Sequence, residues 1–192
     1  RQIMTGFNFF ANHRFHLFAQ RYFCLLFFIL QVRNFSPDEI YNQPRNLYVA
    51  DFIGSPSMNF LEGHLERGTF KVDDMAMPMT GYQFAQAQTA DRPAVIGIRP
   101  EHVVTGELVG NAPLQFDVTV DLVEPMGSDT LVYAKLGRHV FRVRMDGQAR
   151  VRAGTVVAIG IDPSRASLFD KATEIAFAQL DLAGEWVLRD DR

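Results

Sequence analysis

Five apolar residues, 94–98, followed at once by Arg99, Pro100 and Glu101, restrict this chain more than any other stretch. A short apolar run of this length predicts a buried β-strand. Pro100 has no N–H to give to a sheet, and it drives the preceding residue toward an extended conformation. The strand must therefore end at Arg99 and turn a corner, with Arg99 and Glu101 together at the strand end. One interpretation is an exposed corner with a weak ion pair, worth about 0–1 kcal/mol, and the other is a specific interface.

A second stretch, 115–122, alternates apolar and polar residues. Its apolar members, Phe116, Val118, Val120 and Leu122, recur at every second position. Side chains of a strand point alternately to its two faces, so this period of two predicts a strand with one packed face and one wet face.

Further strands are expected between Gly, Pro and Asp turns. Met75, Met77 and Met79 alternate as in a half-buried edge strand. Short strands at regular spacing predict a small barrel or sandwich, so the fold class is mainly β. The remaining predicted strands are 58–65, 68–72, 131–136, 139–145 and 155–161, of which the third and fourth form a hairpin around Gly137 and Arg138.

Two short helices are expected before the strands. Ser36 can cap the first, because Pro37 suits the first helical position and Glu39 stands three residues after the cap. Pro44 interrupts this helix. A second one, over 45–53, is expected to stop at Gly54.

Residues 1–35 differ from the rest of the chain. They hold nine of the 17 Phe, and no acidic residue occurs before Asp38. The apolar run 22–30 is nine residues, against about 20 for a membrane-spanning helix. Three interpretations stay open: an amphipathic helix docked on a partner, a membrane-interface anchor, or a stretch foreign to the fold, such as out-of-frame translation. We favour the third.

The overall composition is that of an ordinary globular protein. The formal net charge is −3, and 47% of the residues are hydrophobic. This balance gives no basic surplus for a phosphate backbone, so we expect no nucleic-acid partner. The single cysteine, Cys24, cannot form an internal disulfide, which favours a reducing compartment such as the cytoplasm.

No catalytic motif emerges from the residues. The phosphate-binding Gly-x-x-x-x-Gly-Lys-Ser/Thr pattern is absent, and the five histidines are scattered, so we expect no bound nucleotide and no zinc site. The pairs Ser128-Asp129 and Ser164-Arg165 sit in turns, where such residues ordinarily hydrogen-bond the local backbone. We therefore expect the chain by itself not to be an enzyme.

Five motifs in order carry a resemblance. They include Ile96-Gly-Ile-Arg-Pro-Glu-His102 and Asp162-Pro163, and they occupy 36–44, 47–60, 96–102, 123–133 and 162–170. Residues 36–178 resemble the C-terminal part of the ATP-binding subunit of sugar-type ABC importers, the maltose and glycerol-3-phosphate importer group.

The resemblance implies a division of the chain. Residues 36–54 would be the last helices of a nucleotide-binding domain, 55–178 a regulatory (transport-associated) domain of OB-type β-barrels, and 179–192 a C-terminal tail. In the family, ATP and Mg are bound by the nucleotide-binding domain, whose phosphate loop and signature motif this sequence does not contain. The chain would then be a truncated ATPase subunit, cytoplasmic and peripheral to the inner membrane, that reaches the membrane subunits only through the missing domain.

The same resemblance implies a homodimer held by two regulatory domains. For its contacts we expect the corner Arg99, Glu101 and His102 together with the turn Gly127, Ser128 and Asp129. The alternative is a free-standing module that binds a small oxyanion or a sugar. Its candidate donors are Arg99, Ser128, Thr130 and Arg165.

Overall fold

The computed structural model describes residues 36–84 and 91–177, which fall into two compact units divided between Gln43 and Pro44. The Phe-rich stretch 1–35, residues 85–90 and the tail from 178 onward lie outside the described residues. Within the described part, no helix is long and apolar enough to cross a membrane.

The first unit contains helix α2 (Pro37–Asn42), which begins as the sequence predicts. Ser36 Oγ accepts from the Glu39 N–H at 3.2 Å, and Glu39 Oε2 accepts from the Ser36 N–H at 2.7 Å. These two bonds satisfy amide groups that a helix start otherwise leaves without partners. The predicted capping box is confirmed.

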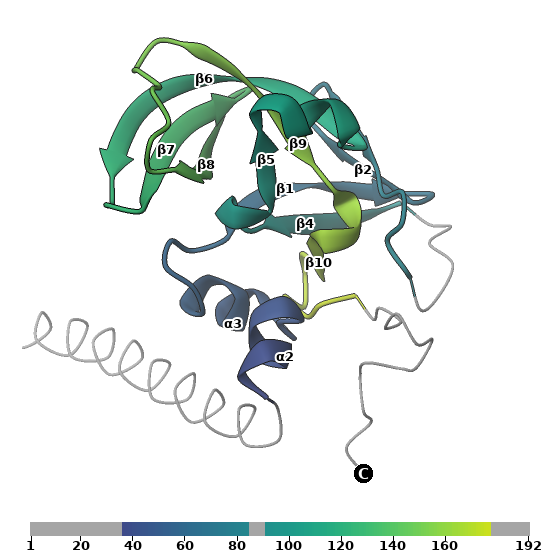
Figure 1. Ribbon diagram of the computed structural model, residues 1–192. Helices are drawn as coiled ribbons and strands as arrows, with labels where there is room; N and C mark the ends of the chain where they lie inside the picture. The colour runs from purple at the N-terminus through teal and green to yellow at the C-terminus, as the bar shows by residue number, and fades with distance from the viewer. Residues whose placement is uncertain (1–35, 85–90, 178–192) are drawn as a thin grey trace, which may run out of the picture. The chain divides into compact units, whose positions relative to one another are not determined.

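The second unit begins with helix α3 (Leu47–Phe52), capped by the Asn46 side chain and ending before Gly54, which has φ +122°. The rest is β-structure in two five-stranded antiparallel sheets with short 3-10 turns between them, which confirms the predicted mainly-β, OB-like fold. Figure 1 shows β6, β7 and β8 curling above β1 and β4, with α3 below them. One sheet has the order β10 (Ser167–Asp170), β4 (Arg92–Ile98), β1 (Asn59–Glu66), β2 (Thr69–Val72), β3 (Met75–Pro78); the other has β5 (Val103–Thr105), β9 (Val156–Ile161), β6 (Leu114–Pro125), β7 (Asp129–Leu136), β8 (His139–Asp146).

The apolar run of β4 is explained by its central place. It pairs with β1 on one side and with β10 on the other. Ala94, Ile96 and Ile98 face the main core, which the two sheets share, whereas Val95 faces a smaller cluster with Ala50 of α3. Because both faces of β4 are covered, its sequence is apolar without alternation.

Strand β6 corrects one expectation. Val118 and Val120 are buried as predicted, but Leu122 is 57% exposed. The register of β6 against β7 shifts between Val120 and Leu122, so one extra residue is inserted there. A β-bulge of this kind moves every later side chain to the opposite face, and the simple alternation fails beyond it.

The side chain of Asn59 joins the two sheets. Its Nδ2 donates to the Arg142 carbonyl at 2.8 Å, and its Oδ1 accepts from the Arg142 N–H at 2.7 Å. Asn59 lies in β1 and Arg142 in β8, so a side-chain amide takes the place of a strand partner along the edge of β8. The bonds are buried, because Asn59 is only 3% exposed.

Candidate functional site

The charged corner after β4 is more buried than the sequence suggests. Arg99 is 1% exposed, and its Nη1 donates to the carbonyl oxygen of Ile53 at 2.8 Å. Ile53 is the C-cap of α3, where a cation is favoured by the helix dipole. The interpretation of an exposed corner is therefore wrong for Arg99, whose guanidinium ties the end of α3 to the end of β4.

His102 lies in the 3-10 turn η1 (Pro100–His102), beside two arginines. Burial lowers the pKa of the imidazole, the positive charge of Arg165 lowers it further, and Glu101 opposes the shift. Its Nδ1 is buried and, within the described residues, has no hydrogen-bond partner. The structure thus brings Arg99, His102 and Arg165 together, although Arg165 is far away in the sequence. This environment favours a neutral His102 at pH 7.

The predicted turn Gly127-Ser128-Asp129 joins β6 to β7 and is exposed at its first two residues. Asp129 pairs with Arg144 of β8, which lowers the pKa of the carboxyl. The Gly147 N–H donates to the Ser128 carbonyl at 2.9 Å, and a Cβ at Gly147 would lie 2.4 Å from the Gly127 carbonyl oxygen. The turn is therefore an exposed surface anchored to the end of β8.

The four donors suggested for an oxyanion site fall into two groups. Arg99 and Arg165 both act on His102, next to η1. Ser128 and Thr130 belong to the β6–β7 turn and the start of β7, and Thr130 is only 2% exposed. Arg99 and Thr130 are buried within the fold itself. The four residues therefore do not form the convergent set of donors that an anion site needs.

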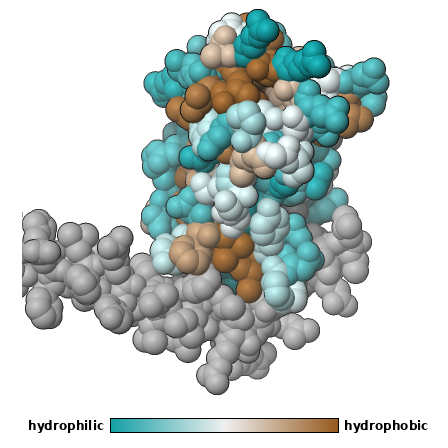
Figure 2. Space-filling model, turned by 60° about the vertical axis from the view of Figure 1, so that its left-hand side comes forward, coloured by the Kyte–Doolittle hydropathy of each residue, from teal (hydrophilic) through white to brown (hydrophobic). Residues whose placement is uncertain are grey.

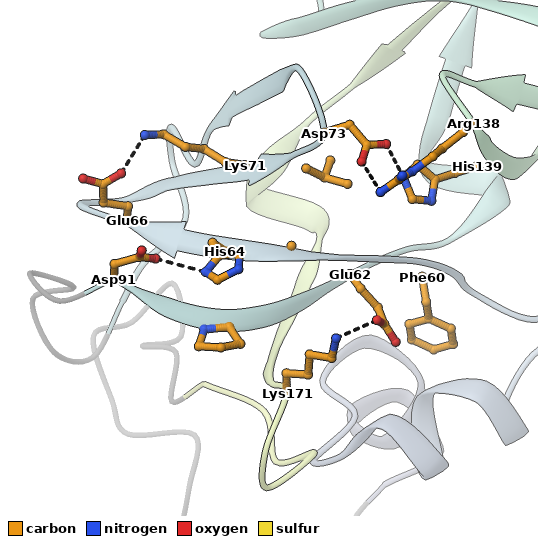
Figure 3. Close-up of a pocket in the computed structure, with 13 residues that line it drawn as sticks. Phe60, Glu62, His64, Glu66, Lys71, Asp73, Asp91, Arg138, His139 and Lys171 are labelled. Carbon is orange, nitrogen blue, oxygen red and sulfur yellow. Dashed lines mark hydrogen bonds and ion pairs between the residues drawn. The ribbon is translucent and has the colours of Figure 1, made fainter.

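A polar groove that the sequence did not indicate lies over β1. It encloses about 980 Å³ and is shown in Figure 3. Its charged lining residues are paired with one another: Lys71 with Glu66 at 2.6 Å, Lys171 with Glu62 at 2.8 Å, and His64 with Asp91 at 3.3 Å. In β1 the charged residues 62, 64 and 66 alternate with positions that include the buried Leu61 and Leu65. This alternation is the sequence signal that one face of the strand is exposed to solvent.

One more group in this groove links the two sheets. Asp73, in the β2–β3 turn, accepts from His139 Nε2 at 2.9 Å and also pairs with Arg138, both in the β7–β8 hairpin. Four acidic side chains line the groove beside three lysine or arginine side chains and two histidines, so the charges nearly balance and leave no strong surplus for a highly charged ligand. Among the described residues there is also no group of three His, Cys, Asp or Glu side chains able to hold a metal ion.

The fold and these surfaces define a small OB-type β-barrel unit. Two family models match it in succession: the MalK OB fold domain at residues 54–103 and the TOBE domain at residues 96–169. The chain thus carries a MalK OB fold domain and a TOBE domain, and the relatives that it matches are ATP-binding subunits of sugar and glycerol-phosphate ABC importers.

Three relatives illustrate the match. The sulfoquinovosyl glycerol transport ATP-binding protein of Agrobacterium fabrum is 38% identical over 142 residues, which is 72% of this chain and 38% of that protein. The osmoprotective compounds uptake ATP-binding protein of Synechocystis is 36% identical, covering 73% of this chain and 40% of the relative. The sn-glycerol-3-phosphate import ATP-binding protein of Escherichia coli is 36% identical, covering 72% and 38%. The matched part of this chain thus corresponds to about two-fifths of the length of these relatives.

Among solved structures, the cytoplasmic molybdate-binding protein ModG with molybdate bound aligns with a TM-score of 0.44 at 14% identity. The alignment covers 57% of this chain and 94% of ModG. This likeness is too weak to carry an argument about a ligand.

Proposed function

We propose that this chain acts as the regulatory and dimerisation domain of an ATP-binding subunit in a carbohydrate-type ABC importer. The observation that carries the proposal is the succession of OB and TOBE matches over residues 54–169, which occupy the folded β-unit. A rigid barrel following a short helix can hold two subunits at high effective concentration while other domains move. The partners are a second copy and, through a nucleotide-binding domain, the membrane subunits, at the cytoplasmic side of the inner membrane.

The proposed contact residues are those of the sequence prediction, less one. Arg99 is buried and bonded to Ile53, so its side chain does not reach a partner. Glu101 and His102 are partly exposed, and Gly127 and Ser128 are exposed beside Asp129. These five residues remain the proposed contact residues.

ATP hydrolysis is not expected from this chain, because no phosphate-binding loop occurs in its sequence. Melting the chain with and without Mg-ATP tests this. A ligand that binds only the folded state raises the melting temperature. We expect no shift, and a rise of several degrees would contradict the proposal.

The alternative, a free-standing ligand module, is separated from the dimer by isothermal titration. The probes are molybdate, sulfate and maltose, each added to the chain. Micromolar binding to a monomer would support the module. A chain that dimerises reversibly and gives no heat with these probes supports the regulatory function.

A further inference from the structure

One face of the second sheet points away from the core. In β7 the core takes Val132, Ala134 and Leu136, so the odd-numbered neighbours face outward. In β8 the core likewise takes Phe141, Val143 and Met145. Figure 2 shows hydrophobic surface in the upper part of the view, where Figure 1 places β6, β7 and β8. We call the following residues the outer face: Leu122, Glu124, Leu131, Tyr133, Lys135, Val140, Arg142 and Arg144.

The outer face has an apolar centre created by the β-bulge. The bulge turns Leu122 outward to 57% exposure and sets it level with Tyr133 of β7. Leu131, on the same side of β7, is 4% exposed and belongs to neither core cluster, so it forms an apolar floor here. Val140 is 63% exposed at the β8 side. A bulge that re-aims a leucine toward solvent is a feature that points to contact rather than to folding.

The two flanks of this centre carry opposite charges. Strand β6 has exposed Asp117, Asp121 and Glu124, whereas β8 has Arg142 and Arg144, followed at its very end by Asp146. Glu124 is opposite Leu131, which in turn is opposite Arg144, so the acid and the base stand at one level across β7.

A two-fold axis parallel to β7 would place β6 of one copy over β8 of the other. Glu124 of each copy then faces Arg144 of the other, Leu131 and Tyr133 of the two copies meet on the axis, and Leu122 of each copy lies over β8 of the other, at the level of Arg142. Lys135 lies near that axis, and its charge is offset by Asp121 at 3.3 Å in the same chain. A surface with an acidic and a basic flank on either side of an apolar centre is self-complementary, which is what an isologous contact requires.

We propose that the outer face, centred on Leu122 and Tyr133, is the surface through which a second copy of this chain binds. This inference rests on the proposed dimerisation and names its surface. The turn at Gly127, Ser128 and Asp129 borders the same end of the face, because Asp129 pairs with Arg144. The turn η1, which carries Glu101 and His102, lies beside β8, so these two residues are assigned to the rim of the contact.

Sedimentation equilibrium of the full 192-residue chain tests the surface. Leu122→Asp should raise the dimer Kd at least about tenfold, as for a central contact residue. The matched control is Leu108→Asp on η2 (Gly106–Asn111), since Leu108 is 62% exposed but lies off this face. The control should dimerise like the parent. Circular dichroism melts on the same samples check that each variant is folded.

A charge exchange provides a second, independent arm. Glu124→Lys and Arg144→Glu should each weaken the dimer, and the double variant should recover most of the lost affinity because the pair is restored with reversed sign. A parent dimer that neither Leu122→Asp nor the charge reversals weaken overturns the surface and leaves the proposed function standing. A parent chain that stays monomeric at about 100 μM overturns both.

Discussion

Asn59 and Arg142 are 83 residues apart, yet the side-chain amide of the first forms both backbone hydrogen bonds of the second, at 2.8 and 2.7 Å. This pair connects β1 to β8, and so connects the OB-matched part of the chain to the TOBE-matched part. The two parts of the chain that match separate family models therefore form one structural unit with a shared core.

Asn59→Ala should destabilise the chain by about 2–3 kcal/mol, because it leaves the buried N–H and C=O of Arg142 without partners. Urea unfolding followed by circular dichroism measures the change. Ser57→Ala is the control, since Ser57 Oγ only accepts from the Arg142 guanidinium at 3.2 Å. Its expected cost is under about 0.5 kcal/mol. Equal stabilities of the two variants would show that the amide bonds do not join the sheets.

Gly63→Ala should cost about 1–3 kcal/mol through overpacking in β1. A Cβ at this position would lie 2.1 Å from the backbone oxygen of Lys71, which cannot move without disturbing β2. Gly110→Ala is the control, because no atom lies within 4 Å of its Cβ position. Thermal melts compare the two, and a Gly63→Ala chain that melts with Gly110→Ala would contradict the close approach of β1 and β2.

His102 should make the stability fall as the pH drops below about 6.5, the ordinary histidine value. Burial and Arg165 lower the pKa of the folded imidazole, while Arg99 adds to that shift and Glu101 opposes it. Between the pKa of His102 in the folded chain and its pKa in the unfolded chain, the unfolded chain binds more protons than the folded one. Lowering the pH through this range therefore lowers the free energy of unfolding. This loss of stability is absent above about pH 6.5. It grows as the pH falls toward the pKa of His102 in the folded chain.

His102→Gln removes that titration. Denaturant unfolding between pH 7.5 and 5 should show a smaller loss of stability in the variant than in the parent. Because both chains keep the other histidines, the difference isolates this side chain. Parallel curves would mean that His102 is protonated as easily in the fold as in the unfolded chain.

Glu101→Lys should leave the fold within about 0.5 kcal/mol of the parent, since the residue is partly exposed. It should weaken self-association less than Leu122→Asp, because a charge at the rim acts mainly on the association rate. Association kinetics at two salt concentrations measure this. A variant that associates like the parent at both concentrations removes the corner from the interface, and one that melts early makes Glu101 a structural residue.

Much of the fold could be predicted, because its signals are local. The Ser36–Glu39 capping box, the turn at Gly137 and Arg138, and the apolar strand before Pro100 each depend on a few neighbouring residues. Leu122 was assigned to the wrong face because a bulge leaves no mark in a pattern of alternating residues. Arg99 appeared to be exposed because its partner, the carbonyl of Ile53, lies 46 residues away and is a backbone atom with no sequence signature.

The surfaces were harder to foresee for the same reason. The Asp73 contact with His139 and the Asn59 contact with Arg142 join positions 66 and 83 residues apart. Their residue types are ordinary at exposed turns and strand ends, so only the closure of the two sheets brings them together. The predicted turn at Gly127, Ser128 and Asp129 is present, but its anchor, Arg144, could not be chosen among the other arginines beforehand.

Sedimentation equilibrium of the parent chain over about 1–200 μM tests the central claim, that this unit joins two copies, most directly. The account predicts that the average mass rises from that of the 21.7 kDa monomer toward twice that mass in one reversible step and then stays level. A mass that remains at the monomer value across the whole range, or one that grows without reaching a plateau, would contradict it.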